Sequence, residues 1–245
     1  MKNPVIRSIF SVLVTVLVPV GLVLGAVRIV LSPWYPKLEY HMPWFPPDRY
    51  GFSRAEREHY ALIALDYLNT NKDISLLLDL HFPPGQTAPP VSCLEMTDCT
   101  LLYNGREIHH MVDVKYVLGI ALPIGYTVIV GLVLLGLWAW KGKWWITYRT
   151  ALRRGGWLMV FILISLIVLV LGVFDWFFTL FHDVFFSPGT WMFYTSDTLI
   201  RLFPERFWMD TFIVVGGIAA LGGLALIFAG SKRNLSLPPL LETRK

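Results

Sequence analysis

The chain has 245 residues, of which 55% are hydrophobic and only 16% are charged, whereas soluble domains usually carry about 25% charged residues. This composition excludes an ordinary soluble domain and indicates an integral membrane protein. The formal net charge of +4 does not indicate nucleic-acid binding, because the basic residues gather at the ends of apolar segments instead of lining one folded face.

Four apolar segments are long enough to cross a membrane as helices, which requires about 20 mostly apolar residues. They cover residues 8–31, 116–140, 157–178 and 211–230. The first segment begins near basic residues, as a signal peptide does, but it is longer than a signal-peptide core and lacks a clean cleavage site. We therefore expect an uncleaved anchor and four transmembrane helices.

Local signals add helices outside the membrane. Ser53 and Glu56 have the spacing of a capping box and predict a helix that ends near Asn69. Asn104 and Glu107 form a second box, and no turn signal separates them from the following apolar segment. The predicted fold class is therefore all-α: four transmembrane helices, with a small, mostly helical and irregular domain between the first and the second.

Charge predicts the orientation. Residues 141–156 hold five Lys and Arg and no acid, and only Glu242 of the 17 Asp and Glu falls on the same side as this loop. Short basic loops stay in the cytoplasm, so we expect both termini inside. The expected parts are a tail and first span (1–31), an extracytoplasmic domain (32–104), a helix entering the second span (105–140), a basic loop (141–156), the third span (157–178), an interfacial loop (179–210), the fourth span (211–230) and a tail (231–245).

The two cysteines, Cys93 and Cys99, lie in the predicted outside domain. Outside the cytoplasm, two nearby cysteines usually form a disulfide. A nucleophilic thiol is the less favoured interpretation, because neither a histidine nor another base lies in this segment.

Titratable residues converge on the predicted outer boundary of the membrane. His110 lies just outside the second span, His182 lies just outside the third, and Arg28 lies within the outer end of the first, where a charge is costly without a partner. Glu107, His110 and Asp113 share one helix face. A carboxylate beside an imidazole fixes its tautomer and raises its basicity, as a general base requires.

The alternative interpretation is that these residues are solvated anchors at the interface. His109 points about 100° away from His110 around a helix, so we expect only one of the pair to act. The chain contains no Gly-x-Ser-x-Gly, His-Glu-x-x-His or Walker motif. An enzyme with a covalent serine therefore lacks an obvious nucleophile, and histidine bases would activate a nucleophile that the substrate supplies.

Several sequence blocks resemble the bacterial lipoprotein intramolecular transacylase (Lit) family of four-span membrane proteins. The blocks are Tyr50-Gly51-Phe52-Ser53, Arg106-Glu107-x-x-His110-Met111-x-Asp113-Val114-Lys115, Phe181-His182-x-x-Phe185-Phe186, Gly189-Thr190-Trp191 and Asp197-x-Leu199-Ile200. The resemblance implies transfer of an acyl chain from the sn-2 ester of a diacylglyceryl lipoprotein to the α-amine of its N-terminal Cys, which leaves a lyso-lipoprotein.

The resemblance also implies a site at the outer leaflet of the bacterial plasma membrane. His110 and His182 correspond to the histidines of the family, and the supporting residues would be Asp113, Glu107, Arg28, Arg106, Asp183, Trp191 and Asp197. We expect a lipoprotein and membrane lipid as partners, no nucleic acid, no cofactor and no resident metal. The sequence makes no prediction of the oligomeric state.

Two other functions stay open at this point. One is a metal-dependent membrane hydrolase with His109 or His110, Asp113 and His182 as ligands, since three nitrogen or oxygen ligands would suffice. The other is a non-enzymatic membrane scaffold or receptor, in which the polar residues are anchors and the outside domain binds a partner.

Overall fold

The computed structural model describes residues 4–231, apart from the side chains of residues 4, 168–172 and 174. Its four long helices are α1 (Pro4–Val30), α6 (Gly105–Lys141), α7 (Trp145–Phe185) and α9 (Glu205–Gly230). Each contains a stretch long and apolar enough to cross a membrane. Within the described residues the fold is helical, with one isolated β-bridge between His81 and Leu101, so the predicted fold class is confirmed.

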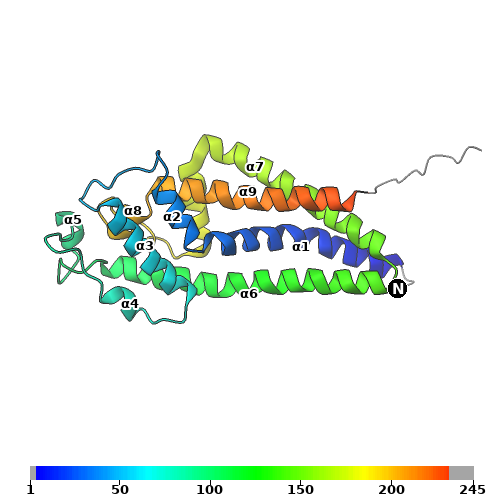
Figure 1. The fold of residues 1–245 in the computed structure, drawn as a ribbon, viewed down its shortest axis with the longest axis horizontal. Coiled ribbons are helices and arrows are strands. Elements are labelled where there is room, and N and C mark those ends of the chain that lie inside the picture. The colour runs from blue at the N-terminus through cyan, green and yellow to red at the C-terminus, as the bar shows by residue number, and fades with distance from the viewer. Residues whose placement is uncertain (1–3, 232–245) are drawn as a thin grey trace, which may run out of the picture.

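The short helices gather at one end of the bundle (Figure 1). They are α2 (Trp34–Tyr40), α3 (Arg54–Asn69), α4 (Ser75–Leu78), α5 (Pro90–Cys93) and α8 (Thr198–Leu202). We call residues 31–104 together with residues 186–204 the cap. The cap has its own apolar core, to which α3, α6 and α8 all contribute.

Both predicted capping boxes are present. Ser53 accepts a hydrogen bond from the backbone N–H of Glu56, and α3 follows. Asn104 and Glu107 form the second box, and α6 then runs without a break to Lys141, with Pro123 inside it. The cap is further held by a disulfide between Cys93 and Cys99 and by a buried ion pair between Arg201 and Asp48, whose charged atoms lie 2.9 Å apart.

The third long helix begins earlier than the sequence predicts. A tight turn at Gly142 and Lys143 (φ 56°) follows α6, and α7 starts at Trp145, so most of the expected loop at 141–156 is helical. The predicted start of the third span was wrong because the basic residues at 141–156 were taken to mark a loop. Arg149 and Arg153 lie in the first turns of α7; Arg153 is exposed, and the Arg149 guanidinium donates to the carbonyl oxygens of Ala229 and Ser231 at the end of α9.

The same helix also bends. Its apolar span covers Trp145–Ile167, and Val173 leaves helical geometry (φ −156°, ψ 53°), which separates α7 into two straight parts. Figure 1 shows the second part, drawn in yellow, turning sharply away from the first. Residues 179–185 are therefore helical, although the sequence predicts them as part of an interfacial loop.

Glycines let the spans approach one another closely. A Cβ atom at Gly156 would lie only 2.5 Å from the carbonyl oxygen of Gly223. The helices α7 and α9 thus meet backbone to backbone, as small residues permit in membrane helices. Because α7 packs mainly against α1 and α9, its bend is needed to bring its far end to α6.

Candidate active site

The first turn of α6 is anchored in the cap by Glu107. This side chain is only 1% exposed. Its carboxylate accepts the backbone N–H of Asn104 at 2.8 Å and the backbone N–H of Leu199 at 2.6 Å. The first N–H groups of a helix have no partner within the helix, and the two oxygens of Glu107 satisfy such groups at the starts of both α6 and α8. Glu107 therefore fixes where His110, one turn further along α6, is held.

Asp197 makes the second connection between α6 and the segment that leads into α8. It is fully buried and accepts hydrogen bonds from the side-chain amide of Asn104 at 3.2 Å and from the backbone N–H of Tyr194 at 2.9 Å. The guanidinium of Arg106 lies 3.4 Å from the same carboxylate and pairs with Glu95 at 2.8 Å. These contacts hold Tyr194 beside the first turn of α6, where the Arg106 guanidinium lies 5.1 Å from the centroid of its ring.

The bend in α7 brings His182 to His110. The centroids of the two imidazole rings lie 6.3 Å apart, and the ring planes are inclined by 24°. This separation exceeds the reach of a direct hydrogen bond between the rings. It leaves room for a reacting group that both rings can approach.

His182 has a defined tautomer in this arrangement. Its Nδ1 lies 2.8 Å from the carbonyl oxygen of Phe178, one turn earlier on α7. A carbonyl can only accept, so Nδ1 carries the hydrogen and Nε2 of the neutral ring keeps its lone pair. Burial lowers the pKa of His182 below its ordinary value, although the Phe178 carbonyl and Asp183 act in the opposite direction. The ring is therefore neutral near pH 7 and suited to accept a proton.

Aromatic rings surround the two histidines. The ring centroids of Phe186 and Phe193 lie 4.8 and 5.3 Å from that of His110, and those of Phe178 and Trp191 lie 4.1 and 4.8 Å from that of His182. Such rings exclude water and lower the local dielectric constant, which strengthens any hydrogen bond made inside.

Two polar atoms at this site lack a hydrogen-bond partner among the described residues. They are Nδ1 of His110 and Nε1 of Trp191, and both are buried. Buried polar groups are nearly always hydrogen-bonded, so each unsatisfied one needs an explanation. They belong to the two rings whose centroids lie 6.3 and 4.8 Å from that of His182, and this arrangement fits a site for a polar ligand atom.

The other predicted site residues lie elsewhere. Asp113 is 3.6 Å from His109, its neighbour at i−4, and not beside His110. Asp183 is exposed and lies next to His182 in the chain. Arg28 donates to the hydroxyl of Tyr126, and Tyr126 lies about 24 Å along α6 from His110 at 1.5 Å per residue. Arg28 therefore does not belong to the histidine site.

Sequence reasoning missed the roles of several aromatic residues and one carbonyl. Phe178 and Phe193 carry no chemical motif, and only the pattern of aromatics near His182 draws attention to the segment. The Phe178 carbonyl follows from the helix itself, because a histidine on a helix can reach the carbonyl four residues earlier. A helical prediction for residues 179–185 would have identified this bond.

A metal centre lacks the necessary ligands in the part of the chain that the structure describes. There, no three His, Cys, Asp or Glu side chains come close enough together to hold an ion. Asp113, the third ligand of the hydrolase hypothesis, turns to His109. The geometry therefore favours acid–base chemistry by the two histidines over a site built on these three residues.

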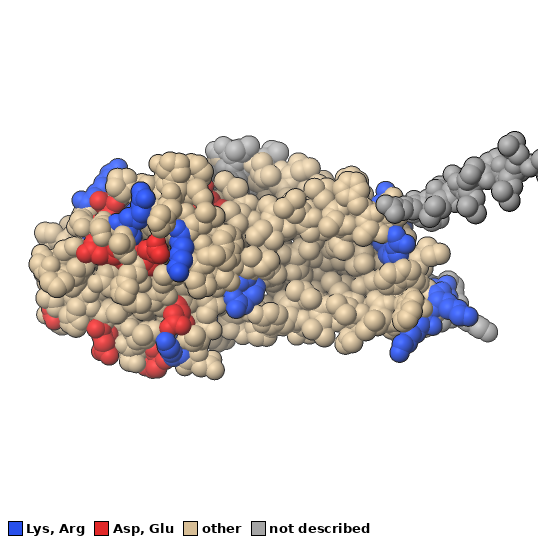
Figure 2. Space-filling model, viewed as in Figure 1, with Lys and Arg blue, Asp and Glu red and all other residues tan. Residues whose placement is uncertain are grey.

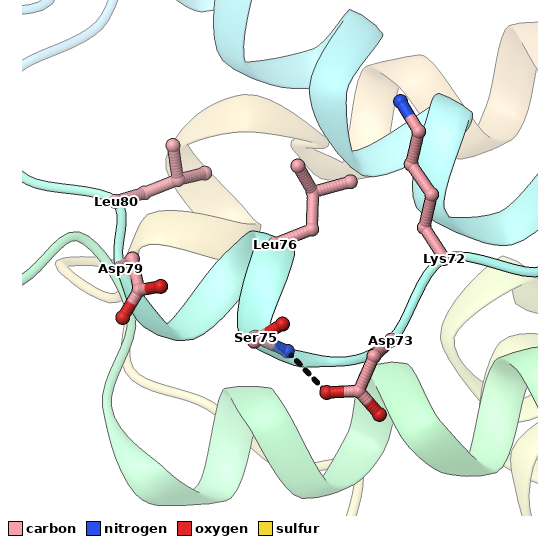
Figure 3. Close-up of a pocket in the computed structure, with 6 residues that line it drawn as sticks. All are labelled: Lys72, Asp73, Ser75, Leu76, Asp79 and Leu80. Atoms are coloured by element: carbon pink, nitrogen blue, oxygen red, sulfur yellow. Dashed lines mark hydrogen bonds between the residues drawn. The ribbon is translucent and has the colours of Figure 1, made fainter.

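Two hollows of the surface lie away from the histidines. One, of about 380 Å³, is an open depression lined by Lys72, Asp73, Ser75, Leu76, Asp79 and Leu80. Figure 3 shows that the side chains of Lys72, Leu76 and Leu80 extend to the same side of this segment, whereas Asp73 accepts a hydrogen bond from the backbone N–H of Ser75. It contains no base positioned for catalysis.

Comparisons with known proteins give a consistent result. The family model described as "Lipoprotein intramolecular transacylase Lit" matches residues 11–208. An uncharacterized protein of Aquifex aeolicus is 29% identical over 225 residues, which cover 91% of this chain and 94% of that protein.

Solved structures agree in fold. The membrane-integral lipoprotein intramolecular transacylase Lit of Bacillus cereus superposes with a TM-score of 0.68 at 18% identity, over 91% of this chain and 94% of that one. A second structure of that protein, with one histidine replaced by alanine, gives a TM-score of 0.64 at 18% identity and covers 92% of both chains.

Proposed function

The chain belongs to the lipoprotein intramolecular transacylase (Lit) family, whose model matches residues 11–208, and we propose that His110 and His182 carry out its acyl transfer. Membership identifies a multi-pass membrane enzyme that acts on lipoproteins. The transfer moves the acyl chain at the sn-2 position of a diacylglyceryl lipoprotein to the α-amine of its N-terminal Cys. The assignment of the histidines rests on the geometry around His182.

The reaction balances without a protein nucleophile. The amine nitrogen forms a bond to the ester carbonyl carbon, and the bond from that carbon to the sn-2 oxygen of glycerol breaks. One proton leaves the amine, and one proton must arrive on the glycerol oxygen. Because the amine and the ester belong to the same molecule, holding them together supplies much of the acceleration.

His182 is the proton carrier in this proposal. Its Nδ1 donates to the Phe178 carbonyl at 2.8 Å, so Nε2 is available to take the proton from the attacking amine. The imidazolium formed then gives the same proton to the departing glycerol oxygen. A base of this kind contributes typically about 10²–10⁴-fold to the rate.

His110 and Trp191 stabilise the negative charge on the carbonyl oxygen. Nδ1 of His110 and Nε1 of Trp191 are buried without partners among the described residues, and each donates one hydrogen bond to the oxyanion as it forms. Donors fixed in a water-poor site are worth more than donors in water. The two unsatisfied atoms of the free enzyme are thus satisfied in the transition state.

We also propose that the cap and the histidine site face the outside of the cell and that both termini are cytoplasmic. The acidic side chains visible in Figure 2 gather at the cap end of the molecule, whereas Lys and Arg alone mark the opposite end. Basic residues stay on the cytoplasmic side of a membrane. This distribution supports a site at the outer leaflet.

The single observation that carries the proposal is the convergence of His110 and His182, with ring centroids 6.3 Å apart, inside an aromatic enclosure.

The function is tested by co-expressing the protein with a diacylglyceryl lipoprotein in a host without any other N-acylating enzyme. Because the transfer is intramolecular, the lipopeptide keeps its mass. An amine-reactive label and tandem mass spectrometry therefore provide the readout.

The expected result is an N-terminal Cys that no longer takes the label and whose N-terminal fragment ion carries the acyl chain. A lipopeptide that still takes the label, with both acyl chains on glycerol, would overturn the proposal. Hydrolysis without transfer would lower the mass by one acyl chain and would identify a lipase instead.

A further inference from the structure

Arg28 is one of the predicted site residues that the acyl-transfer site does not use. It stands in the last turn of α1, and its three hydrogen bonds go to neutral oxygen atoms. Nε donates to the Tyr126 hydroxyl at 3.0 Å, and Nη1 donates to the Leu31 carbonyl at 3.3 Å and to the side-chain oxygen of Asn69 at 3.4 Å. No ion pair within 4.0 Å among the described residues includes Arg28.

The depth of this group explains why its charge needs a partner. A hydrocarbon layer of about 30 Å corresponds to about 20 helical residues. Counted back from Lys141, the last residue of α6, this length ends near residue 121. Tyr126 lies inside that limit, and side chains on a helix tilt toward its N-terminus, which for α6 is the cap end. Arg28 and the Tyr126 hydroxyl therefore meet at the cap-side boundary of the membrane.

The group keeps unused donors at that boundary. Nη2 of Arg28 makes no hydrogen bond to the residues that the structure describes. The Tyr126 hydroxyl, which accepts from Arg28, retains its own hydrogen, and Tyr126 is 49% exposed. A planar guanidinium with an adjacent hydroxyl matches the oxygen atoms of a phosphate.

The surroundings fit a lipid bearing that phosphate. Lys115 lies on the same face of α6 as Tyr126, about 16 Å nearer the N-terminus of the helix; its ammonium donates to the Lys72 carbonyl at 2.6 Å and sits 3.9 Å from the ring centroid of Tyr67. On the membrane side, exposed apolar side chains of α6 continue from Tyr126: Ile129, Val130 and Val133. A headgroup at Arg28 would thus have acyl chains lying along this surface.

We propose that Arg28 and Tyr126 bind the phosphate of a membrane phospholipid at the cap-side boundary, between α1, α3 and α6, while the side-chain oxygen of Asn69 holds the guanidinium in place. The bound molecule is not the lipoprotein substrate, because a diacylglyceryl thioether carries no phosphate. The site is separate from the histidines, since Tyr126 and His110 are about 24 Å apart along α6.

The experiment uses the full chain, purified in a neutral detergent and stripped of lipid. Native mass spectrometry and thermal unfolding are recorded with phosphatidylglycerol, with monoolein as a lipid without phosphate, and with inorganic phosphate. Phosphatidylglycerol alone should give a persistent one-lipid adduct and a higher unfolding temperature. Equal stabilisation by monoolein would show that acyl chains suffice, and stabilisation by inorganic phosphate would identify a site for free anions; each overturns the proposal.

Variants separate the phosphate contact from general packing. Arg28→Gln should weaken phosphatidylglycerol binding about tenfold or more, as loss of a charged hydrogen bond implies, and Tyr126→Phe should weaken it while keeping the ring. Arg49→Gln, a change at an exposed cap residue, is the matched control. If Arg28→Gln does not fold, the affinity of Tyr126→Phe for phosphatidylglycerol alone tests the proposal. Wild-type affinity in Tyr126→Phe, or in a folded Arg28→Gln, contradicts the proposal.

Discussion

Nδ1 of His182 is held by the carbonyl oxygen of Phe178 at 2.8 Å, which leaves Nε2 without a hydrogen on a ring whose centroid lies 6.3 Å from that of His110. This bond needs no residue outside α7, because residue i−4 of the same helix supplies the acceptor. Its consequence is chemical: the proton-accepting nitrogen is defined before substrate binds. The kink at Val173 then decides where that nitrogen lies.

Acidic pH should inactivate the enzyme through His182. Burial lowers the pKa of this ring below 6.5, so the neutral form persists at pH 7. Once the rate is divided by the fraction of neutral α-amine in the substrate, whose pKa is about 7.7–8.0, transacylation should stay constant through neutral pH and fall only at pH values below 6.5, as Nε2 becomes protonated. The folded state binds fewer protons than the unfolded state in that range, so stability should also decrease as the pH falls. A rate profile and a thermal-unfolding series against pH measure the two effects.

A carboxylate next to His182 provides the control for this profile. Asp183 raises the pKa of His182, so Asp183→Asn should move the acidic limb of the rate profile to lower pH. Asp113→Asn should leave the limb in place, because Asp113 pairs with His109. If the acidic limb shifted in Asp113→Asn but not in Asp183→Asn, the limb would not belong to His182.

Removal of the Trp191 indole N–H tests the oxyanion contact. Trp191→Phe keeps an aromatic ring against His182 but loses Nε1, an unsatisfied buried donor. The turnover rate should fall by about 10²–10³-fold, as for loss of one oxyanion donor, with little change in KM. Steady-state kinetics with a synthetic diacylglyceryl lipopeptide gives both constants. An unchanged rate, or a loss confined to KM, would assign Trp191 to substrate packing.

Glu107 should prove structural. Its carboxylate accepts two backbone N–H groups, and leaving a buried donor unsatisfied costs about 1–3 kcal/mol. Glu107→Ala should therefore lower the unfolding temperature strongly, and Glu107→Gln, which keeps one good acceptor, should lower it less. Glu58→Gln, which alters a partly exposed carboxylate near His41, serves as the control.

Comparing the loss of activity with the loss of folded protein distinguishes a structural role of Glu107 from a direct action on an imidazole. A structural residue gives activity losses that follow the loss of folded protein, and the active fraction keeps the wild-type pH profile. A shifted acidic limb in well-folded Glu107→Gln protein would mean that this carboxylate acts on an imidazole instead.

Much of the fold could be predicted because its signals are local. The four spans follow from apolar length, and α3 and α6 begin at the capping boxes of Ser53 and Asn104. The start of α7 was predicted too late, because the basic residues Arg149 and Arg153 were taken to mark a loop. In the structure both residues are helical: Arg153 is exposed, and Arg149 donates to carbonyl oxygens at the end of α9.

The site was predictable only as far as single residues. Helical spacing alone allows the Asp113 carboxylate to contact either His109 or His110. It also allows the Glu107 side chain to point either toward His110 or into the cap. Contacts distant in sequence decide between these choices. The Leu199 N–H holds Glu107 in the cap, and the bend at Val173, which no composition signal announces, selects the partner of His110.

The most direct test of the account compares single histidine variants by the same amine-labelling and tandem mass-spectrometric readout, at matched amounts of folded protein in the membrane. His182→Ala should abolish transfer of the acyl chain to the Cys amine, and His110→Ala should reduce it at least about 10²-fold. His109→Ala, which changes the exposed neighbour, should retain most activity. Wild-type transfer in either His110→Ala or His182→Ala would contradict the two-histidine mechanism.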